Sequence, residues 1–155
     1  MKYSIDTSAI LDGWRRYYPP DIFPPLWGKL SQLIRDGDLI ATEEVLIEIK
    51  KRDDDEVYAW VQQHRNMFVP IDEQIQLMVA EILKDHPKLI DTRPNRSKAD
   101  PFVIALARLH GCAVVTGERP SNSSSRPNIP DVCALLKIRS INLLQLIREQ
   151  GWRFQ

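Results

Sequence analysis

The sequence predicts an α/β fold with a central, mostly parallel sheet of short strands that helices cover on both faces. Two observations carry this prediction. Short apolar runs alternate with longer segments in which apolar residues recur at helical spacing. Polar or acidic residues stand directly after several of the apolar runs, where a buried strand would end. Neither a repeat nor a linker divides the 155 residues, so we expect one domain over residues 1–155.

Two strands and three helices are predicted between residues 2 and 51. A strand over 2–5 leads into a helix, capped by Thr7 or Ser8, that ends before the prolines at 19 and 20. The next helix begins at the prolines 24 and 25, which a first turn tolerates, and ends at Gly37. A strand over 39–41 then precedes a helix over 43–51, for which Thr42 is a favourable N-cap.

The remaining residues predict five more helices and two more strands. Helices are expected from the aspartates at 53–55, over 72–84 and over 100–110, where Gly111 ends the helix. An irregular, basic and proline-rich stretch over 87–98 separates the last two. A strand over 113–116 is followed by a polar loop and a short helix from about 130. A strand near 138–141 and a helix over 143–150 complete the alternating pattern.

Composition narrows the class of protein. The chain has 21 basic and 21 acidic residues, whereas a non-specific nucleic-acid coat is strongly basic. Its 43% hydrophobic content is too high for a disordered tail. No apolar run approaches the roughly 20 residues of a membrane span, and the N-terminus reaches a charge too soon for a signal peptide. Cys112 and Cys133 are expected to be buried free thiols, with a disulfide or metal pair as the alternative, which fits the cytoplasm.

Five carboxylates lie at the ends of apolar runs or within them. They are Asp6, Glu48, Asp100, Glu118 and Asp131. In parallel sheets ligands bind outside the carboxyl ends of the strands, so carboxylates placed there converge. Convergent carboxylates suit a hard divalent cation such as Mg²⁺ or Mn²⁺, because these ions prefer oxygen ligands. Such a cation suits phosphodiester chemistry.

Most of these carboxylates also have a simpler structural explanation. Asp6 could cap the helix that follows it, and Glu48 could be a solvated helix flank. Asp100 follows Ser97 at the spacing of a capping box, and Asp131 would lie in a first helical turn. Glu118 directly follows a strand end and has no capping role that the sequence reveals.

Basic residues flank the acidic positions. Arg96 and Lys98 precede Asp100, while Arg119 and Arg126 bracket the serine-rich loop after Glu118. They are predicted to contact RNA phosphates, which position a nucleic acid without reading its sequence. The alternative is that they are solubilising loop charges.

Other chemistry is not supported by the sequence. No glycine-rich phosphate loop and no nucleophile elbow is present, and the three histidines lack metal-ligand spacing. The larger aromatic side chains are expected to be core or interface anchors rather than base-stacking platforms. These are Trp14, Tyr17, Tyr18, Trp27 and Trp60.

The ordered set of these segments resembles PIN-domain ribonucleases, and more closely a PIN-like subgroup of compact prokaryotic proteins of the VapC toxin type. The resemblance covers nearly the whole chain. It is carried by Ile5-Asp6-Thr7-Ser8, Thr42 followed by Glu48, Lys98-Ala99-Asp100, Val114-Val115-Thr116-Gly117-Glu118, Ile129-Pro130-Asp131-Val132-Cys133 and Ile141-Asn142-Leu143-Leu144.

The resemblance implies a PIN-like three-layer α/β/α fold and a metal site. Asp6, Glu48 and Asp100 would occupy its three best-defined acidic positions. With Glu118, which stands where the family usually has Asp, they would be the catalytic residues and hold the metal, and Asp131 would be a further metal ligand.

Two threonines are expected to support that site. Thr7 and Thr116 would hydrogen-bond the carboxylates that hold the metal.

By the same resemblance the chain is expected to be an Mg²⁺- or Mn²⁺-dependent endoribonuclease that hydrolyses RNA and leaves a 5′-phosphate. It would be the toxin of a toxin–antitoxin pair, inhibited by a small antitoxin protein, and a homodimer. One alternative is a non-catalytic PIN-like binding module, which the Glu at position 118 keeps open. The other is a phosphatase or phosphotransfer domain with Asp6 as nucleophile, but Ser8 stands where a second acid would be needed.

Overall fold

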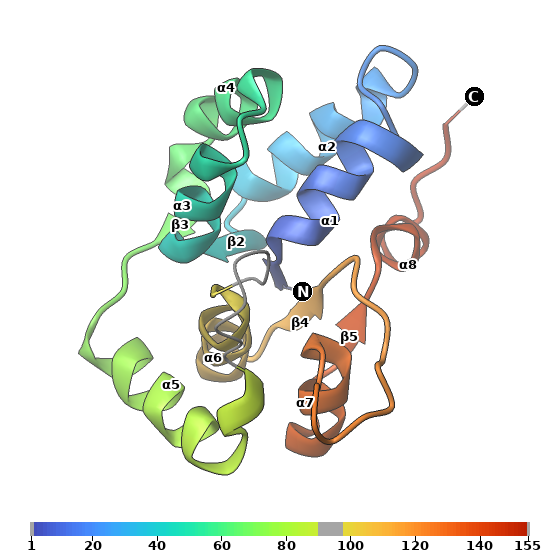
Figure 1. The fold of residues 1–155 in the computed structure, drawn as a ribbon. Coiled ribbons are helices and arrows are strands. Elements are labelled where there is room, and N and C mark those ends of the chain that lie inside the picture. The colour runs from blue at the N-terminus through green and yellow to red at the C-terminus, as the bar shows by residue number, and fades with distance from the viewer. Residues whose placement is uncertain (1, 90–97, 155) are drawn as a thin grey trace.

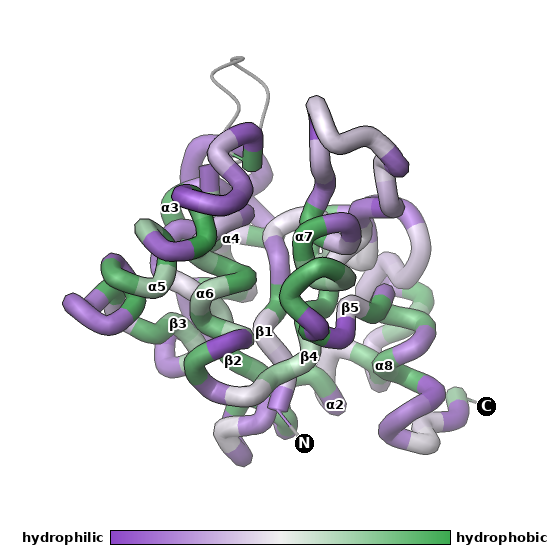
Figure 2. The backbone as a smooth tube through the Cα atoms, turned by 90° about the horizontal axis from the view of Figure 1, so that it is seen from below, coloured by the Kyte–Doolittle hydropathy of each residue, from purple (hydrophilic) through white to green (hydrophobic). Residues whose placement is uncertain are grey.

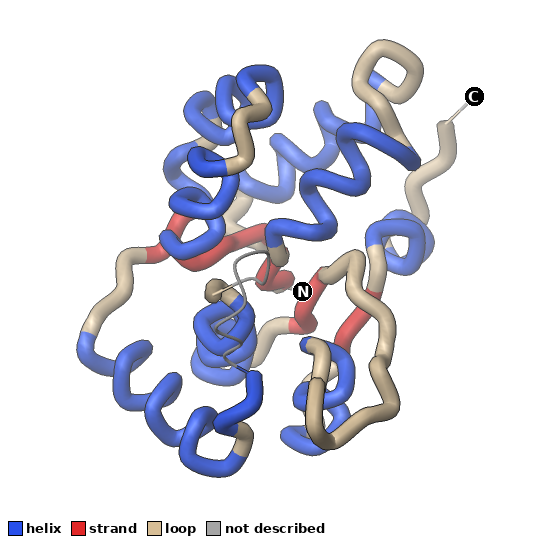
Figure 3. Tube along the Cα trace, viewed as in Figure 1, coloured by secondary structure: helices blue, strands red, loops and turns tan. Residues whose placement is uncertain are grey.

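The computed structural model describes residues 2–89 and 98–154 and places a five-stranded parallel sheet at their centre (Figures 1 and 3). The strands lie in the order β3-β2-β1-β4-β5. Their bounds are β1 Tyr3–Ile5, β2 Leu39–Thr42, β3 Phe68–Val69, β4 Ala113–Val115 and β5 Ser140–Ile141. Every neighbouring pair is parallel. The predicted α/β class is therefore confirmed.

Helices cover both faces of this sheet, and Figure 1 shows the three layers. On one face lie α1 Thr7–Asp12, α2 Pro24–Arg35, α3 Glu43–Lys51, α4 Asp55–Gln63 and α8 Leu143–Glu149. On the other face lie α5 Glu73–Asp85, α6 Asp100–His110 and α7 Ile129–Leu136. Short 3₁₀ turns occur as η2 Arg65–Met67 and η3 Pro87–Leu89. None of the described helices combines the length and the apolar character that a membrane crossing requires.

Local sequence signals explain most helix boundaries. The side chains of Thr42, Asp54 and Asp72 accept hydrogen bonds from the first turns of α3, α4 and α5. Gly111 ends α6 with a φ of 64°, a left-handed conformation that glycine adopts at low cost. These boundaries agree with the predicted ones within a residue or two.

Two elements differ from the prediction. The first helix is not α-helical throughout, because α1 passes into the π-helix η1 over Gly13–Tyr17. The strand β3 was not predicted, since two half-buried residues are too short to show an alternating pattern. Pairing of Phe68 with Ala41 of β2 makes it part of the sheet.

Strand order determines where a ligand can bind. From β1 the chain moves outward through β2 to β3 and then returns across the sheet to β4, on the other side of β1. The order of the strands thus reverses between β1 and β4. The carboxyl ends of two such strands form the crevice in which open α/β sheets bind ligands.

Helix α6 is central to the core and contacts β1, β2 and β4. Seven of its eleven residues are buried, and Figure 2 colours much of this helix hydrophobic. Cys112 and Cys133 are both buried free thiols, as expected. Burial raises the pKa of the Cys133 thiol to about 12, so the thiol stays protonated in the folded protein.

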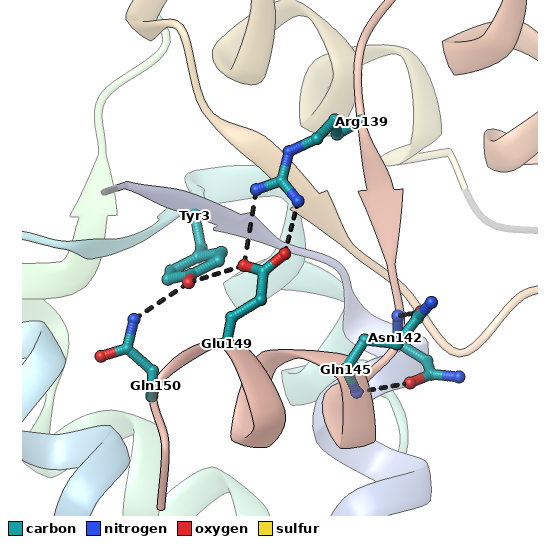
Figure 4. Close-up of polar contacts among 6 residues, drawn as sticks. All are labelled: Tyr3, Arg139, Asn142, Gln145, Glu149 and Gln150. Carbon is teal, nitrogen blue, oxygen red and sulfur yellow. Dashed lines mark hydrogen bonds and ion pairs between the residues drawn. The ribbon is translucent and has the colours of Figure 1, made fainter.

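A polar network joins the C-terminal helix to the central strand (Figure 4). The buried hydroxyl of Tyr3 in β1 donates to Glu149 Oε2 at 3.0 Å and accepts from Gln150 Nε2 at 3.0 Å. Arg139 forms an ion pair with the same Glu149. The two ends of the described chain are therefore held together.

Candidate active site

Three carboxylates converge at the point where the strand order reverses. They belong to Asp6, Asp100 and Glu118, and one ligand oxygen of each lies within 4.8 Å of the others. Asp6 directly follows β1, Glu118 comes shortly after β4, and Asp100 is the first residue of α6, which packs under both strands. The group arises because the ends of β1 and β4 and the start of α6, which are distant in sequence, meet at one edge of the sheet.

Asp6, which directly follows β1, is buried, with 2% of its surface exposed. Its Oδ2 atom accepts hydrogen bonds from Ser8 Oγ at 2.6 Å and Thr116 Oγ1 at 3.0 Å. Its Oδ1 atom is buried and accepts no hydrogen bond from the described residues. The side chain makes no capping bond to α1, so the cap explanation does not account for it.

The pKa of Asp6 is raised above its ordinary value. Burial is the main cause, because it disfavours the charged form. The hydrogen bonds from Ser8 and Thr116 oppose the shift, and the nearby charge of Glu48 adds to it. A positive charge bound beside Oδ1 would reverse this balance.

Asp100 is 1% exposed and stands in the first turn of α6. The N-cap of this helix is Ala99, and no side chain caps it locally. Ser97, the cap that the sequence suggests, lies outside the described residues. The positive end of the helix dipole favours a carboxylate at this position.

Glu48 anchors the start of α6 from the neighbouring helix α3. Its Oε1 atom accepts from the backbone amides of Lys98 at 3.0 Å and Ala99 at 3.1 Å. Its Oε2 atom accepts from Thr7 Oγ1 at 2.6 Å. Glu48 thus lies beside the three-carboxylate group rather than in it, and it positions the turn that carries Asp100.

Glu118 has two neighbours besides the acidic group. Its Oε2 atom accepts from the amide of Ile129, the first residue of α7, at 3.0 Å. Its own amide donates to Thr116 Oγ1 at 3.1 Å. The Glu118 side chain therefore lies between the helix start and the acidic group.

The carboxylate of Asp131 makes its hydrogen bonds outside the three-carboxylate group. Its Oδ2 atom accepts from Ser121 N, Ser121 Oγ and Asn128 N at 2.7–2.9 Å. With Asn128 it forms a capping box at the start of α7. Burial alone would raise the pKa of Asp131. The hydrogen bonds stabilise the charged form more strongly, so the pKa lies below its ordinary value. Asp131 holds the serine-rich loop closed, and the described acidic group does not include it.

Ser8 is a supporting residue that sequence reasoning missed. Besides donating to Asp6, its Oγ atom accepts from the amide of Gly117 at 2.9 Å. One hydroxyl therefore links the ends of β1 and β4. The sequence does place a hydroxyl two residues after Asp6. Its contact with Gly117 becomes apparent only from the strand order, which brings the ends of β1 and β4 together.

Three of the four predicted RNA-contacting residues lie within the described part of the chain, and all three are exposed. Lys98 directly precedes the buried start of α6 and is exposed. Arg119 follows Glu118, and both it and Arg126 are exposed. Arg96 lies outside the described residues.

A family model described as a domain of unknown function (DUF4411) matches residues 3–154. The chain belongs to this family. Two solved structures share the fold of this DUF4411 member. VapBC2 from Rickettsia felis, bound to a DNA fragment from its promoter, has a TM-score of 0.58 and 13% identity over 92% of this chain and 98% of that one.

FitAcB from Neisseria gonorrhoeae has a TM-score of 0.54 and 15% identity over 90% of this chain and 96% of that one. No curated protein matches significantly. The expected PIN-like three-layer architecture is thereby confirmed for this DUF4411 chain.

Proposed function

We propose that this protein is a metal-dependent endoribonuclease whose ligands are Asp6, Asp100 and Glu118. The observation that carries the proposal is the convergence of these carboxylates within 4.8 Å at the strand-order reversal, with Asp6 Oδ1 buried and without a hydrogen bond from the described residues. A buried carboxylate oxygen without a donor is costly unless a cation occupies the position beside it.

The donor set fits Mg²⁺ or Mn²⁺. All three ligands are carboxylates, the kind that hard divalent cations prefer, and no described thiol or imidazole joins them. When bound, such a cation would neutralise charge on the phosphate and lower the pKa of an attacking water.

The protein's own side chains would position the site. Ser8 and Thr116 orient Asp6 through hydrogen bonds to Oδ2, which leaves Oδ1 without a donor among the described residues. Glu48, which Thr7 orients, fixes the turn before Asp100. We therefore assign Glu48 a positioning role and Asp131 a structural one, in place of direct metal contact.

The substrate we propose is RNA, held by its phosphates. Lys98, Arg119 and Arg126 are exposed cations on segments that border the acidic group. Their charge would balance the acids when a polyanion approaches, without reading sequence.

We also propose that the protein is a toxin inhibited by a small antitoxin protein, that it is a homodimer, and that it acts in the cytoplasm. The sequence resemblance to VapC-type proteins and the fold shared with VapBC2 and FitAcB support the first part. Two buried free thiols suit a reducing compartment.

The test is cleavage of single-stranded RNA with Mg²⁺ or Mn²⁺, with and without a chelator. Wild type and Asp72→Asn should cleave with metal and stop in EDTA. Asp72→Asn is a matched control, because it removes a carboxylate from a helix cap far along the chain, where Asn also caps well. Asp100→Asn should be inactive but folded. Cleavage that continues in EDTA would refute the metal mechanism. A folded wild type that binds RNA without cleaving it would support the binding-module alternative.

A further inference from the structure

A pocket beside the acidic group shares Glu118 with it and extends beyond the three carboxylates. Its volume is about 260 Å³, just below the roughly 300–1,000 Å³ typical of small-molecule sites. Residues that follow β1, β4 and β5 line it, so it lies on the same carboxyl edge of the sheet as the acids. Glu118 belongs to both, and Thr116, which lines the pocket, donates a hydrogen bond to Asp6, so the pocket lies next to the acidic group.

One wall of the pocket carries an aromatic ring that the core does not use. Tyr17 ends the π-helix η1 and is 59% exposed, although the sequence suggested a core or interface anchor. The tryptophans Trp14 and Trp27 are packed instead, with ring centroids 4.8 Å apart. π-Helical turns are frequent at functional sites, and this one places Tyr17 at the pocket. An exposed ring there is suited to stacking on a nucleobase.

The pocket is also lined by a carboxylate. Asp12 lines it, and its Oδ2 atom lies 2.7 Å from where a Cβ would stand on Gly117. The side chain therefore reaches from α1 to the segment after β4, and a larger residue at position 117 would displace it. None of the described residues donates a hydrogen bond to Asp12. An ionised carboxylate offers two acceptor oxygens and no donor, so this surface selects a ligand edge rich in donors.

We propose that this pocket binds a guanine base of the RNA, with Tyr17 stacked on the ring and Asp12 accepting from its N1–H and N2–H groups. Guanine is the RNA base with two adjacent donors on its Watson–Crick edge, and single-stranded bases are read by stacking and by that edge. Uracil presents one donor between two carbonyl oxygens, and the carboxylates of Asp12 and Glu118 would repel those oxygens. The exposed Arg119 would face the attached phosphate.

The inference rests on the proposed ribonuclease function and adds base selection to it. Asp12 and Tyr17 become residues that determine specificity, outside the three-carboxylate group. Its test therefore measures binding separately from cleavage.

The experiment uses fluorescently labelled single-stranded RNA hexamers that differ at one position, which is guanine, inosine or uracil. Affinities are measured by anisotropy in EDTA with the full chain. Wild type should bind the guanine hexamer most tightly, because inosine lacks the N2 amino group. Tyr17→Ala should weaken that affinity roughly 5- to 150-fold, the range for loss of one base stack, while Tyr17→Phe should not. Asp12→Asn should bind guanine and inosine hexamers equally.

Leu77→Ala, which shortens an exposed apolar side chain on α5, is the matched control and should bind as wild type does. Equal affinity of wild type for all three hexamers, combined with metal-dependent cleavage, would overturn base selection and leave the ribonuclease function intact. Absence of both binding and cleavage would overturn both. If Tyr17→Ala abolished binding of a protein partner but left RNA binding unchanged, the pocket would be a protein-docking site and the proposal would be refuted.

Discussion

Asp6 combines full burial, a raised pKa and a carboxylate oxygen without a hydrogen bond from the described residues. A residue chosen for stability alone would not have this combination, because the ionised side chain destabilises the folded state. A group whose pKa is raised on folding contributes stability below its unfolded pKa and loses it as pH rises through the folded pKa. The apo protein should therefore be strained near neutral pH.

We predict that Asp6→Asn raises the melting temperature of the metal-free protein at pH 7, since the amide removes the charge but keeps the size. The gain should shrink as pH falls toward the unfolded pKa of about 3.9, where wild type is also neutral. Thermal melts of both proteins across this pH range measure it. An unchanged or lower melting temperature at pH 7 would contradict a strained, ionised Asp6.

The three acids should differ in their effect on cleavage. Asp6→Asn and Asp100→Asn are each expected to lower the cleavage rate at least ~100-fold, the scale of losing a main transition-state stabiliser. Glu118→Gln should be milder, because its side chain also holds the start of α7. Single-turnover rates at saturating metal rank the variants. A wild-type rate for Asp6→Asn would locate the site elsewhere.

Asp131 should behave in the opposite way to Asp6. Its lowered pKa means that it contributes stability above its unfolded pKa, which is lost as pH falls through the folded pKa. Asp131→Ala should lower the free energy of unfolding by about 1–2 kcal/mol at pH 7, the upper range for a lost cap, and by less in acid. Urea unfolding at both pH values tests this. Loss of metal affinity without loss of stability would instead make Asp131 a metal ligand.

Among the elements, α6 depends on a residue from another helix. No local side chain caps it, and Glu48 of α3 accepts from the amides at its start. Glu48→Ala should lower the free energy of unfolding by about 1–3 kcal/mol, the cost of leaving such donors unsatisfied. Glu48→Gln keeps an acceptor and should cost less. If Glu48 were mainly a metal ligand, Gln and Ala would reduce activity equally and leave stability unchanged.

The helices were largely predictable because their signals are local. Thr42, Asp54, Asp72 and Gly111 mark boundaries through bonds or backbone conformations within a few residues. The π-helix η1 was not predictable, because the sequence of its turn is compatible with an α-helix and tertiary packing decides the difference.

The same limit applies to the site. Asp6 and Asp100 could be picked out from their placement next to apolar runs. The contacts of Glu48 with the start of α6, and of Asp12 with the glycine after β4, join segments far apart in sequence. Such pairings follow from strand order, which periodicity does not encode.

At the scale of the whole molecule, metal binding should be coupled to folding. Ligand that binds only the folded state at a hundredfold excess over Kd stabilises it by about 2.7 kcal/mol. Wild type should gain that order of stability from Mg²⁺ or Mn²⁺, and Asp6→Asn much less. Melts with and without metal decide this. Identical gains for the two proteins would count against the three-carboxylate site.

RNA affinity should depend on the exposed cations as a set. Replacing Arg119 and Arg126 together with Ala should weaken binding similarly across RNA sequences and flatten its salt dependence. The double variant Lys29→Ala, Arg35→Ala removes two exposed cations from α2, which leads into the amino end of β2, and serves as the control. A changed base preference with an unchanged salt slope would contradict a phosphate-binding role.

The central position of β1 has a consequence for synthesis in the cell. The first strand to leave the ribosome lies in the middle of the finished sheet and needs β4 on one side before its acid meets the others. Because chains emerge from the N-terminus, Asp6 stays without Glu118 until the segment that follows β4 has also been translated. A nascent chain that ends before β4 would therefore carry no assembled acidic group.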